Sequence, residues 1–446
     1  MGVDDPGQAY ENEITEIEAC YVDVLGQLKI LYLPIEHFKK LLEEGTGVDL
    51  SSITHVVGTE QSDYRIKAVP ESYAIIPWKT HTARVFCNVL KPCESDEETI
   101  PYEGDSRYVL RRVVEESSLF MNKHLGTEGA NYQLLVGPEI EFFIIDKSQS
   151  TDYSRVDSLG YFDPVQGPMD DLRGQIVSYM RKMGLQPEYS HHEVAPSQME
   201  VGPKFRPALP MADATVMTKD IIRRAADSMG YLATFIPKLW TNENGSGMHL
   251  HINMARVDDN GEPVENLFLN KETGELSQLG IYFIGGVLKH ADAMAALTNP
   301  TCVSYKRLVP GWEAPTAKKW GRRNRTGAIR QPDITDANSI RIEVRFPDPS
   351  ANPYLAYAAM LAAGIDGIKN EIDPGAPTEE DIYKMKDVPM LPGSLDIALD
   401  HLDKSETLRN ALGKTIVDEF LEVKRKEVME YDRMVTNIDM LNYLRV

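Results

Sequence analysis

A strictly alternating stretch near the C-terminal third of the chain, SIRIEVRFPDP at residues 339–349, restricts the local structure more than any other segment. Because successive side chains of a strand point to opposite faces, it predicts a strand with one apolar and one charged face. The apolar parity holds Ile340, Ile342, Val344 and Phe346, and the charged parity holds Arg341, Glu343 and Arg345. Alone, such a face fits the exposed side of a half-buried sheet. Its role depends on which other charged faces lie beside it.

Two further alternating segments carry polar side chains on one parity: VGPEIEFFIID at 136–146 and GMHLHINM at 247–254. The polar positions are Glu139 and Glu141 in the first, and His249, His251 and Asn253 in the second. Clustered carboxylates are costly unless a cation lies between them or a pKa is raised, so they indicate a metal site. Taken singly, an exposed strand face for the glutamates and a hydrogen-bonded structural pair for the histidines remain alternatives.

A third acidic pair, Glu193 and Glu200, flanks a proline-containing bend in HHEVAPSQMEVGP. A bend allows two carboxylates that are distant in sequence to converge. The full candidate donor set is Glu139, Glu141, Glu193, Glu200, Glu343 and His249. Such an oxygen-rich set favours Mg²⁺ or Mn²⁺ over zinc or copper.

Two arginine-bearing segments accompany these acids: SYKRLVPGWEAP, with Arg307 and Glu313, and GRRNRTGAIRQP, with Arg325 and Arg330. The second segment alone is equally consistent with a solvated basic loop. Divalent metals together with arginines are typical of phosphoryl transfer. Since the sequence has no G-x-x-x-x-G-K-[ST] loop, a phosphate donor would have to be held by metals and arginines.

Composition limits the class of protein. The 446 residues include 47 Lys and Arg against 68 Asp and Glu, a formal charge of -21, which disfavours nucleic acid or an anionic membrane as a partner. The four cysteines lack metal-type spacing, and no signal peptide or apolar run of about 18 residues is evident. We therefore expect a reduced, cytoplasmic compartment.

The chain divides into two predicted domains of α+β class. Short apolar runs and turn signals predict a small strand-rich domain at residues 16–104. Asp105 or Ser106 can then cap a helix that opens a larger domain, residues 105–446, in which helical patterns alternate with strands.

The motifs, taken in order, resemble class I glutamine synthetases over nearly the whole chain from about Ile17. The matching segments are GPEIEFFI, HHEVAPSQME, NGSGMHLHINM, NPTCVSYKRLVPGWEAP, RRNRTGAIR and RIEVRFPDPSANPYLAYAAMLAAGIDGIKN. The resemblance implies a β-grasp-like N-terminal domain and a catalytic domain with a curved antiparallel sheet flanked by helices. It also implies ATP-dependent ligation of ammonia to the γ-carboxylate of glutamate through γ-glutamyl phosphate.

The resemblance further assigns a role to each matching residue. For the metals, it implies that one ion is bound by Glu141, Glu193 and Glu200, and the second by Glu139, His249 and Glu343. For the phosphoryl group and the glutamate, it implies Arg325, Arg345, Arg330, Arg307, Asn244 and Gly245. For the nucleotide, it implies Phe205, His251, Asn253 and Arg341. For the ammonium pocket, it implies the flap residue Glu313 with Asp49, Ser52, Tyr161 and Glu193.

Departures from the family pattern keep alternatives open. Leu50 stands where a glycine usually follows the acid at Asp49, and PDITDANS lacks the usual basic residues. A γ-glutamyl ligase that uses a polyamine, ethanolamine or methylamine is therefore one alternative, and a catalytically silent regulatory or structural relative is another. The resemblance also implies a dodecamer of two stacked hexameric rings, in which Asp49 of one subunit completes the active site of its neighbour.

Overall fold

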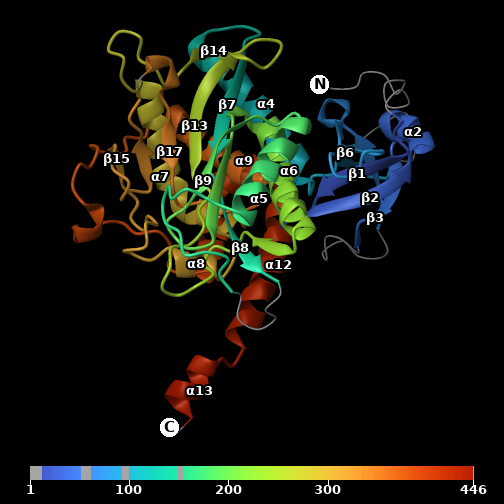
Figure 1. Ribbon diagram of the computed structural model, residues 1–446. Coiled ribbons are helices and arrows are strands. Elements are labelled where there is room, and N and C mark those ends of the chain that lie inside the picture. Colours follow the sequence, from blue (N-terminus) through green and yellow to red (C-terminus); the bar gives the residue numbers. More distant parts are fainter. Residues whose placement is uncertain (1–12, 52–61, 93–99, 148–153, 335, 445–446) are drawn as a thin grey trace.

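The computed structural model describes residues 13–51, 62–92, 100–147, 154–334 and 336–444, and Figure 1 shows a small N-terminal unit beside a larger one. The small unit is a sheet of order β2-β1-β6-β4-β3, with β5 on β6 and with parallel pairing only between β1 and β6 among its described strands. Its elements are β1 Glu16–Val22, β2 Leu28–Pro34, η1 Ile35–His37, α2 Phe38–Glu43, β3 Thr46–Asp49, β4 Asp63–Ala68, η3 Pro70–Ser72, β5 Ala74–Ile75 and β6 Thr82–Leu90. Ile17, Phe38 and Leu41 are buried in its core.

The helix start that the capping signal predicted is present in the structure. The Asp105 carboxylate accepts a hydrogen bond from the Arg107 N–H and caps α4, Ser106–Leu125. Gly126, with φ of 67°, ends this helix in the left-handed conformation that favours glycine.

Two sheets make up the centre of the large unit. Their strand orders are β12-β8-β10-β9 and β11-β7-β13-β17-β16-β15, the latter with β14 on β13. All described pairs in them are antiparallel except β15 with β16. The strands are β7 Asn131–Pro138, β8 Ile140–Asp146, β9 Pro187–His192, β10 Gln198–Pro203, β11 Arg206–Pro207, β12 Tyr231–Thr234, β13 Leu250–Val257, β14 Pro263–Asn266, β15 Trp320–Arg322, β16 Ile329–Gln331 and β17 Ile342–Val344.

The predicted strand at 136–146 is two strands. The chain leaves one sheet after Pro138 and enters the other at Ile140, and the Glu139 N–H between them donates to the His249 carbonyl at 2.9 Å. A proline has no N–H for a sheet ladder, which favours a strand end there. Glu139 and Glu141 therefore stand at the junction of the two sheets instead of on one flat face.

Helices cover these sheets, so the α+β prediction is confirmed (Figure 1). They are α5 Pro168–Lys182, α6 Ala208–Ser228, α7 Gln278–Thr298, α8 Ser304–Arg307, η4 Ala337–Ser339, α9 Pro353–Lys369, η5 Ile382–Lys384, α10 Leu395–Lys404, α11 Glu406–Leu412, α12 Lys414–Asp432 and α13 Asn437–Tyr443. Helices α7 and α9 cross in close contact, since a Cβ on Gly286 would lie 2.0 Å from the Ala363 carbonyl oxygen. In the described part of the chain, no helix combines the length and apolarity needed to cross a membrane.

A buried ion triad joins the two units. The Arg84 guanidinium on β6 pairs with Glu18 on β1 at 2.6 Å and with Asp220 on α6 at 2.8 Å. Arg84 and Glu18 are fully buried, and loss of one partner of a buried pair is costly. The triad therefore fixes the small sheet against α6.

One lysine in the core makes the stability of the fold depend on pH. Lys219 on α6 is buried, and its Nζ donates to the Pro349 carbonyl at 2.6 Å. Burial lowers the pKa of Lys219 to about 7; Arg223 adds a smaller effect in the same direction, and Asp348 opposes it. In an unfolded chain a lysine pKa is about 10.4, so between these values the unfolded state binds more protons and stability rises with pH. This rise in the free energy of unfolding amounts to at most about 1.4 kcal/mol per pH unit, and we expect Lys219→Met to remove it.

The measurement is the thermal midpoint of wild type and Lys219→Met at pH 7, 8 and 9. The thermal midpoint of the wild type should rise relative to that of Lys219→Met as the pH increases. Lys404→Met is the exposed-site control, because 80% of the Lys404 side chain is accessible, and its thermal midpoint should follow that of the wild type. Parallel curves for wild type and Lys219→Met would show that Lys219 keeps an ordinary pKa in the fold.

Candidate active site

A cavity of about 1390 Å³ opens between the two sheets of the large unit. Nearly every predicted site residue lines it: Glu139, Glu141, Tyr161, Glu193, Glu200, Phe205, Asn244, Gly245, His249, His251, Asn253, Arg307, Glu313, Arg325, Arg330, Arg341 and Arg345. Glu343 is fully buried against this wall, where it contacts Arg330 and Arg345. Asp49 lies on the small sheet, and Ser52 lies outside the described residues. Residues from five strands, helix α8 and several loops thus converge at one cavity.

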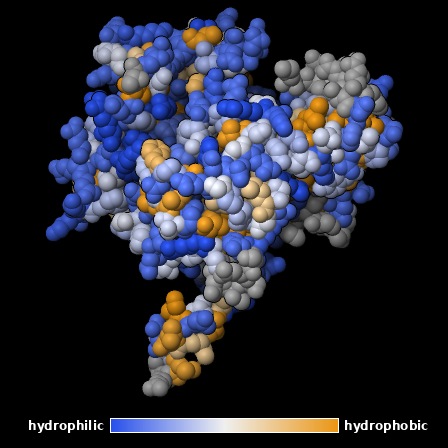
Figure 2. Space-filling model, in the orientation of Figure 1, coloured by the Kyte–Doolittle hydropathy of each residue, from blue (hydrophilic) through white to orange (hydrophobic). Residues whose placement is uncertain are grey.

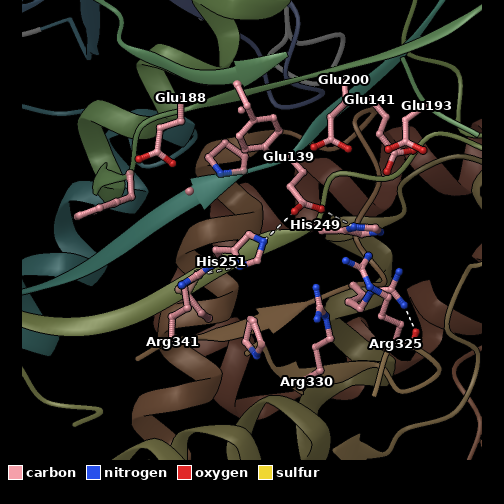
Figure 3. A pocket seen from close by; sticks show the side chains of 18 of the residues that line it. Glu139, Glu141, Glu188, Glu193, Glu200, His249, His251, Arg325, Arg330 and Arg341 are labelled. Atoms are coloured by element: carbon pink, nitrogen blue, oxygen red, sulfur yellow. Dashed lines mark hydrogen bonds and ion pairs between the residues drawn. The ribbon is translucent and has the colours of Figure 1, made fainter. Parts of the chain in front are cut away.

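The first cluster gathers two carboxylates and two imidazoles, of which Figure 3 labels Glu139, His249 and His251. Glu139 accepts from His249 Nδ1 at 2.7 Å and from His251 Nε2 at 2.8 Å. Glu343 lies 3.8 Å from His249 Nδ1 and 3.7 Å from His251 Nε2. The atoms that could hold a single metal ion come from Glu139, His251 and Glu343, while His249 contacts the same two carboxylates. His251, which the resemblance placed on the nucleotide side, is thus part of this cluster.

The second cluster contains a histidine that the sequence did not single out. His191, Glu193 and Glu200 offer ligand atoms within 4.8 Å of one another. His191 stands directly opposite Glu200 on the paired strands β9 and β10. Its neighbour His192 points elsewhere and pairs with Asp157 at 3.2 Å. The only sequence signal was the HH pair before Glu193, and knowing which histidine faces the cavity requires the strand register.

Glu141 lies beside the second cluster, on β8 opposite Glu200 on β10. Its carboxylate accepts from the Gly247 N–H at 2.8 Å and from Gln198 Nε2 at 3.1 Å. Glu141 is not among the ligand atoms of that cluster in this structure. Its assignment as a ligand therefore stays a prediction.

The electrostatics of the two clusters differ. Burial, with repulsion from Glu139 and Glu141, raises the pKa of Glu200 to about 11, and burial with Glu193 holds the pKa of Glu141 well above its usual range. At Glu139, burial works to raise the pKa, but the hydrogen bonds from His249 and His251 lower it well below the usual value. Crowded carboxylates of this kind are stabilised by a cation, so the donor set fits a divalent metal.

Three arginines that line the cavity, Arg325, Arg330 and Arg345, lie across from the acids, and Figure 3 labels Arg325 and Arg330 on that side. Arg330 lies 2.5 Å and Arg345 3.0 Å from Glu343. Arg325, exposed to the cavity, accepts at its backbone carbonyl from Arg345. Together they place positive charge across the cavity from the carboxylates, as a bound polyphosphate requires.

Arg307 is engaged by the protein itself. It is buried, and its Nη1 and Nη2 groups donate to the carbonyls of Phe346 at 2.8 Å and Arg345 at 3.2 Å and to His249 Nε2 at 3.5 Å. These contacts hold it against the loop after β17. Its predicted role in holding the glutamate carboxylate stays a prediction.

The flap carboxylate is placed over the cavity. Glu313 accepts from Asn244 Nδ2 at 2.7 Å, which joins the predicted catalytic flap residue to a predicted substrate-binding residue from a distant segment. The side chain is exposed, so it remains accessible to a molecule in the cavity. A carboxylate in this position can accept a proton.

A cavity with two acid-rich clusters that fit divalent metals and with facing arginines, carried by curled sheets beside a small sheet domain, is typical of an enzyme that handles phosphate. Comparison with known proteins makes this specific. The chain matches the family model for the glutamine synthetase β-grasp domain at residues 13–92 and that for the glutamine synthetase catalytic domain at residues 103–443. The chain belongs to the glutamine synthetase family.

Individual relatives agree. The chain is 40% identical to a glutamine synthetase of Thermotoga maritima, over 97% of each chain, and 41% identical to one of Thermococcus kodakarensis, over 94% of this chain and 91% of that one. Among solved structures it resembles a GmaS/ADP complex with a TM-score of 0.87 at 29% identity, covering 99% of this chain and 100% of that chain. It also resembles a glutamine synthetase of Plasmodium falciparum with a TM-score of 0.83 at 25% identity, covering 99% of each. The predicted family and fold are therefore confirmed.

Proposed function

We propose that the protein is an ATP-dependent glutamate–ammonia ligase that forms glutamine through γ-glutamyl phosphate. The observation that carries this proposal is the single cavity in which two acid and imidazole clusters face Arg325, Arg330 and Arg345. That pairing suits a reaction in which a phosphoryl group moves between two anionic oxygens. The family membership and the relatives named glutamine synthetase support it.

We propose two divalent ions, Mg²⁺ or Mn²⁺, in each active site. Glu139, Glu343 and the two histidines would hold one ion, and Glu141, Glu193, Glu200 and His191 the other. Bound there, the ions would supply positive charge that neutralises the phosphate oxygens.

The chain's own residues have distinct tasks in this scheme. A γ-carboxylate oxygen of glutamate attacks the γ-phosphorus of ATP, and the bond to ADP breaks. Arg325 and Arg345 orient and stabilise the transferring group, with Arg330 beside it. Ammonia then attacks the carbonyl carbon, phosphate leaves, and Glu313 accepts the proton released from nitrogen. Phe205, Asn253 and Arg341 would contact the nucleotide, and Tyr161, Asn244 and Gly245 the amino acid and ammonium.

The choice of amine is tested by amide formation and phosphate release with ATP, glutamate and a panel of acceptors. We expect the highest kcat/KM with ammonium, compared with methylamine, ethanolamine and a polyamine. We also expect Glu313→Ala to lower kcat for amide formation by about 10²- to 10⁴-fold, with a smaller effect on ATP binding, because a general base contributes mainly to the transition state. A higher kcat/KM for any alkylamine would establish the alternative ligase instead.

We also propose the assembly that the resemblance implies, a dodecamer with active sites shared between subunits. Helix α13 projects from the body and presents a largely apolar surface (Figures 1 and 2), on which Ile438, Leu441 and Tyr443 are exposed. An apolar helix in this position supports burial against another copy of the chain. We also place the domain boundary between residues 104 and 105. The proposed role is glutamine biosynthesis in nitrogen metabolism, and the proposed location is the cytoplasm, where ATP is available.

A further inference from the structure

The flap that carries Glu313 adopts a strained backbone. Glu313 has φ of 55° and Gly311 has φ of 90°. For a residue with a Cβ, this left-handed region costs about 1 to 2 kcal/mol and persists only where surrounding contacts impose it. The contacts that hold this turn therefore determine where the Glu313 carboxylate lies.

Two of these contacts act on flap side chains. Asn244 Nδ2 donates to the Glu313 carboxylate at 2.7 Å, and Lys238 Nζ lies 4.4 Å from the centre of the Trp312 ring. Both side chains can rotate away when a substrate replaces them. Neither contact fixes the flap backbone.

A third contact does hold the backbone, and it comes from Tyr383. Its hydroxyl donates to the Ala314 carbonyl at 3.1 Å, directly after Glu313. Tyr383 lies in η5, whose N-terminal end is held by two contacts: the Asp381 carboxylate accepts from the Tyr383 N–H, and the Ile382 N–H donates to Thr326 Oγ1 at 3.1 Å. Tyr383 therefore lies in a fixed position and holds the flap backbone through this hydrogen bond.

Tyr383 also lies among the groups proposed to do the chemistry. It lines the same cavity, and its pKa is raised by burial and by Glu313, against opposing effects of Arg345 and Arg307. The hydroxyl therefore stays protonated at neutral pH and acts as a donor.

We propose that Tyr383 is a positioning residue that latches the flap over the reacting centre, so that Glu313 meets the incoming amine and water is excluded. This role rests on the proposed ligase function. When the latch is missing, water instead of ammonia attacks the carbonyl carbon of γ-glutamyl phosphate. The carbon–oxygen bond to phosphate breaks, and glutamate, inorganic phosphate and a proton are released, so ATP is consumed without amide formation.

The test is Tyr383→Phe, which removes only the hydroxyl. Loss of one hydrogen bond shifts an equilibrium by about two- to tenfold. We expect hydrogen exchange of the backbone amides in residues 308–316 to be faster by this factor in Tyr383→Phe than in the wild type, both without substrates. In turnover with saturating ATP, glutamate and ammonium, we expect the ratio of phosphate released to amide formed to rise above the wild-type value of about one.

Tyr357→Phe is the matched control, because its hydroxyl also makes one hydrogen bond, with Thr215 Oγ1 at 2.9 Å, but is buried in the helical core. It should leave flap exchange and the product ratio unchanged even if it lowers stability. Unchanged flap exchange in Tyr383→Phe overturns the latch whether or not the protein is active, and so does a fall in both products at a ratio of one. A wild type that forms no amide with any amine overturns the ligase function separately, while the exchange measurement still decides the role of Tyr383.

Discussion

Glu343→Gln should reduce turnover by at least about a hundredfold, the loss typical of removing a group that stabilises charge at a reacting centre. Glu343 is fully buried, it is the carboxylate between Arg330 and Arg345, and it belongs to the first cluster. The amide keeps the shape of the side chain but removes an anionic donor to the metal. We therefore expect weaker Mn²⁺ binding, measured by titration, together with the loss of glutamine formation.

The matched control is Glu116→Gln on α4, whose carboxylate is largely exposed and pairs with Arg112 at 3.0 Å. It should keep wild-type metal binding and turnover. Thermal melting of both variants separates a local loss from unfolding, which is necessary because Glu343→Gln leaves two buried arginines without their anion. Full activity of Glu343→Gln at saturating Mg²⁺ would remove Glu343 from the set of metal ligands.

The alternating segment around Glu343 shows how far sequence reasoning reached in the fold. It correctly predicted a strand with one apolar and one charged parity, although the regular strand covers only Ile342–Val344. Alternation reports which side chains share a face, because the period of a strand is fixed. Alternation does not report whether a face is exposed to solvent. A charged face in solvent and the buried charged face found here therefore have the same sequence pattern.

The break at Glu139 and the role of His191 show where sequence reasoning stopped. A strand that ends at Pro138 and a second that starts two residues later in another sheet have the same alternation as one continuous strand. His191 and His192 are adjacent, and only the pairing of β9 with β10 decides that His191 faces Glu200. Both outcomes depend on contacts between distant segments, which local periodicity does not encode.

The resemblance assigns Asp49 to the active site, but Asp49 does not line the cavity of its own chain. It is exposed at the end of β3 in the small sheet, where its carboxylate accepts from the Ser51 N–H at 2.9 Å and from Ser51 Oγ at 2.7 Å. The cavity in the large unit is lined without it. The buried triad of Arg84, Glu18 and Asp220 fixes the small sheet against α6, so a hinge motion that carries Asp49 to its own cavity would have to break that triad.

A neighbouring subunit can bring an Asp49 to the cavity without any such motion. A head-to-tail contact between identical chains places a different surface of each against the next and closes into a ring. The small sheet of one chain would then cover the cavity of another. Shared sites predict complementation between two variants that are each inactive: Asp49→Ala, which lacks the donated acid, and Glu343→Ala, which lacks the metal ligand.

After subunit exchange, some interfaces will pair an intact Asp49 from the Glu343→Ala chain with an intact Glu343 from the Asp49→Ala chain. With random mixing of equal amounts, about a quarter of the sites should be intact, since each half of a site is wild type with probability about one half. Mass spectrometry verifies the exchange, and each variant taken alone through the same procedure gives the background. If exchange is complete and activity stays at that background, Asp49 serves the site of its own chain or none, and the shared-site assembly is wrong.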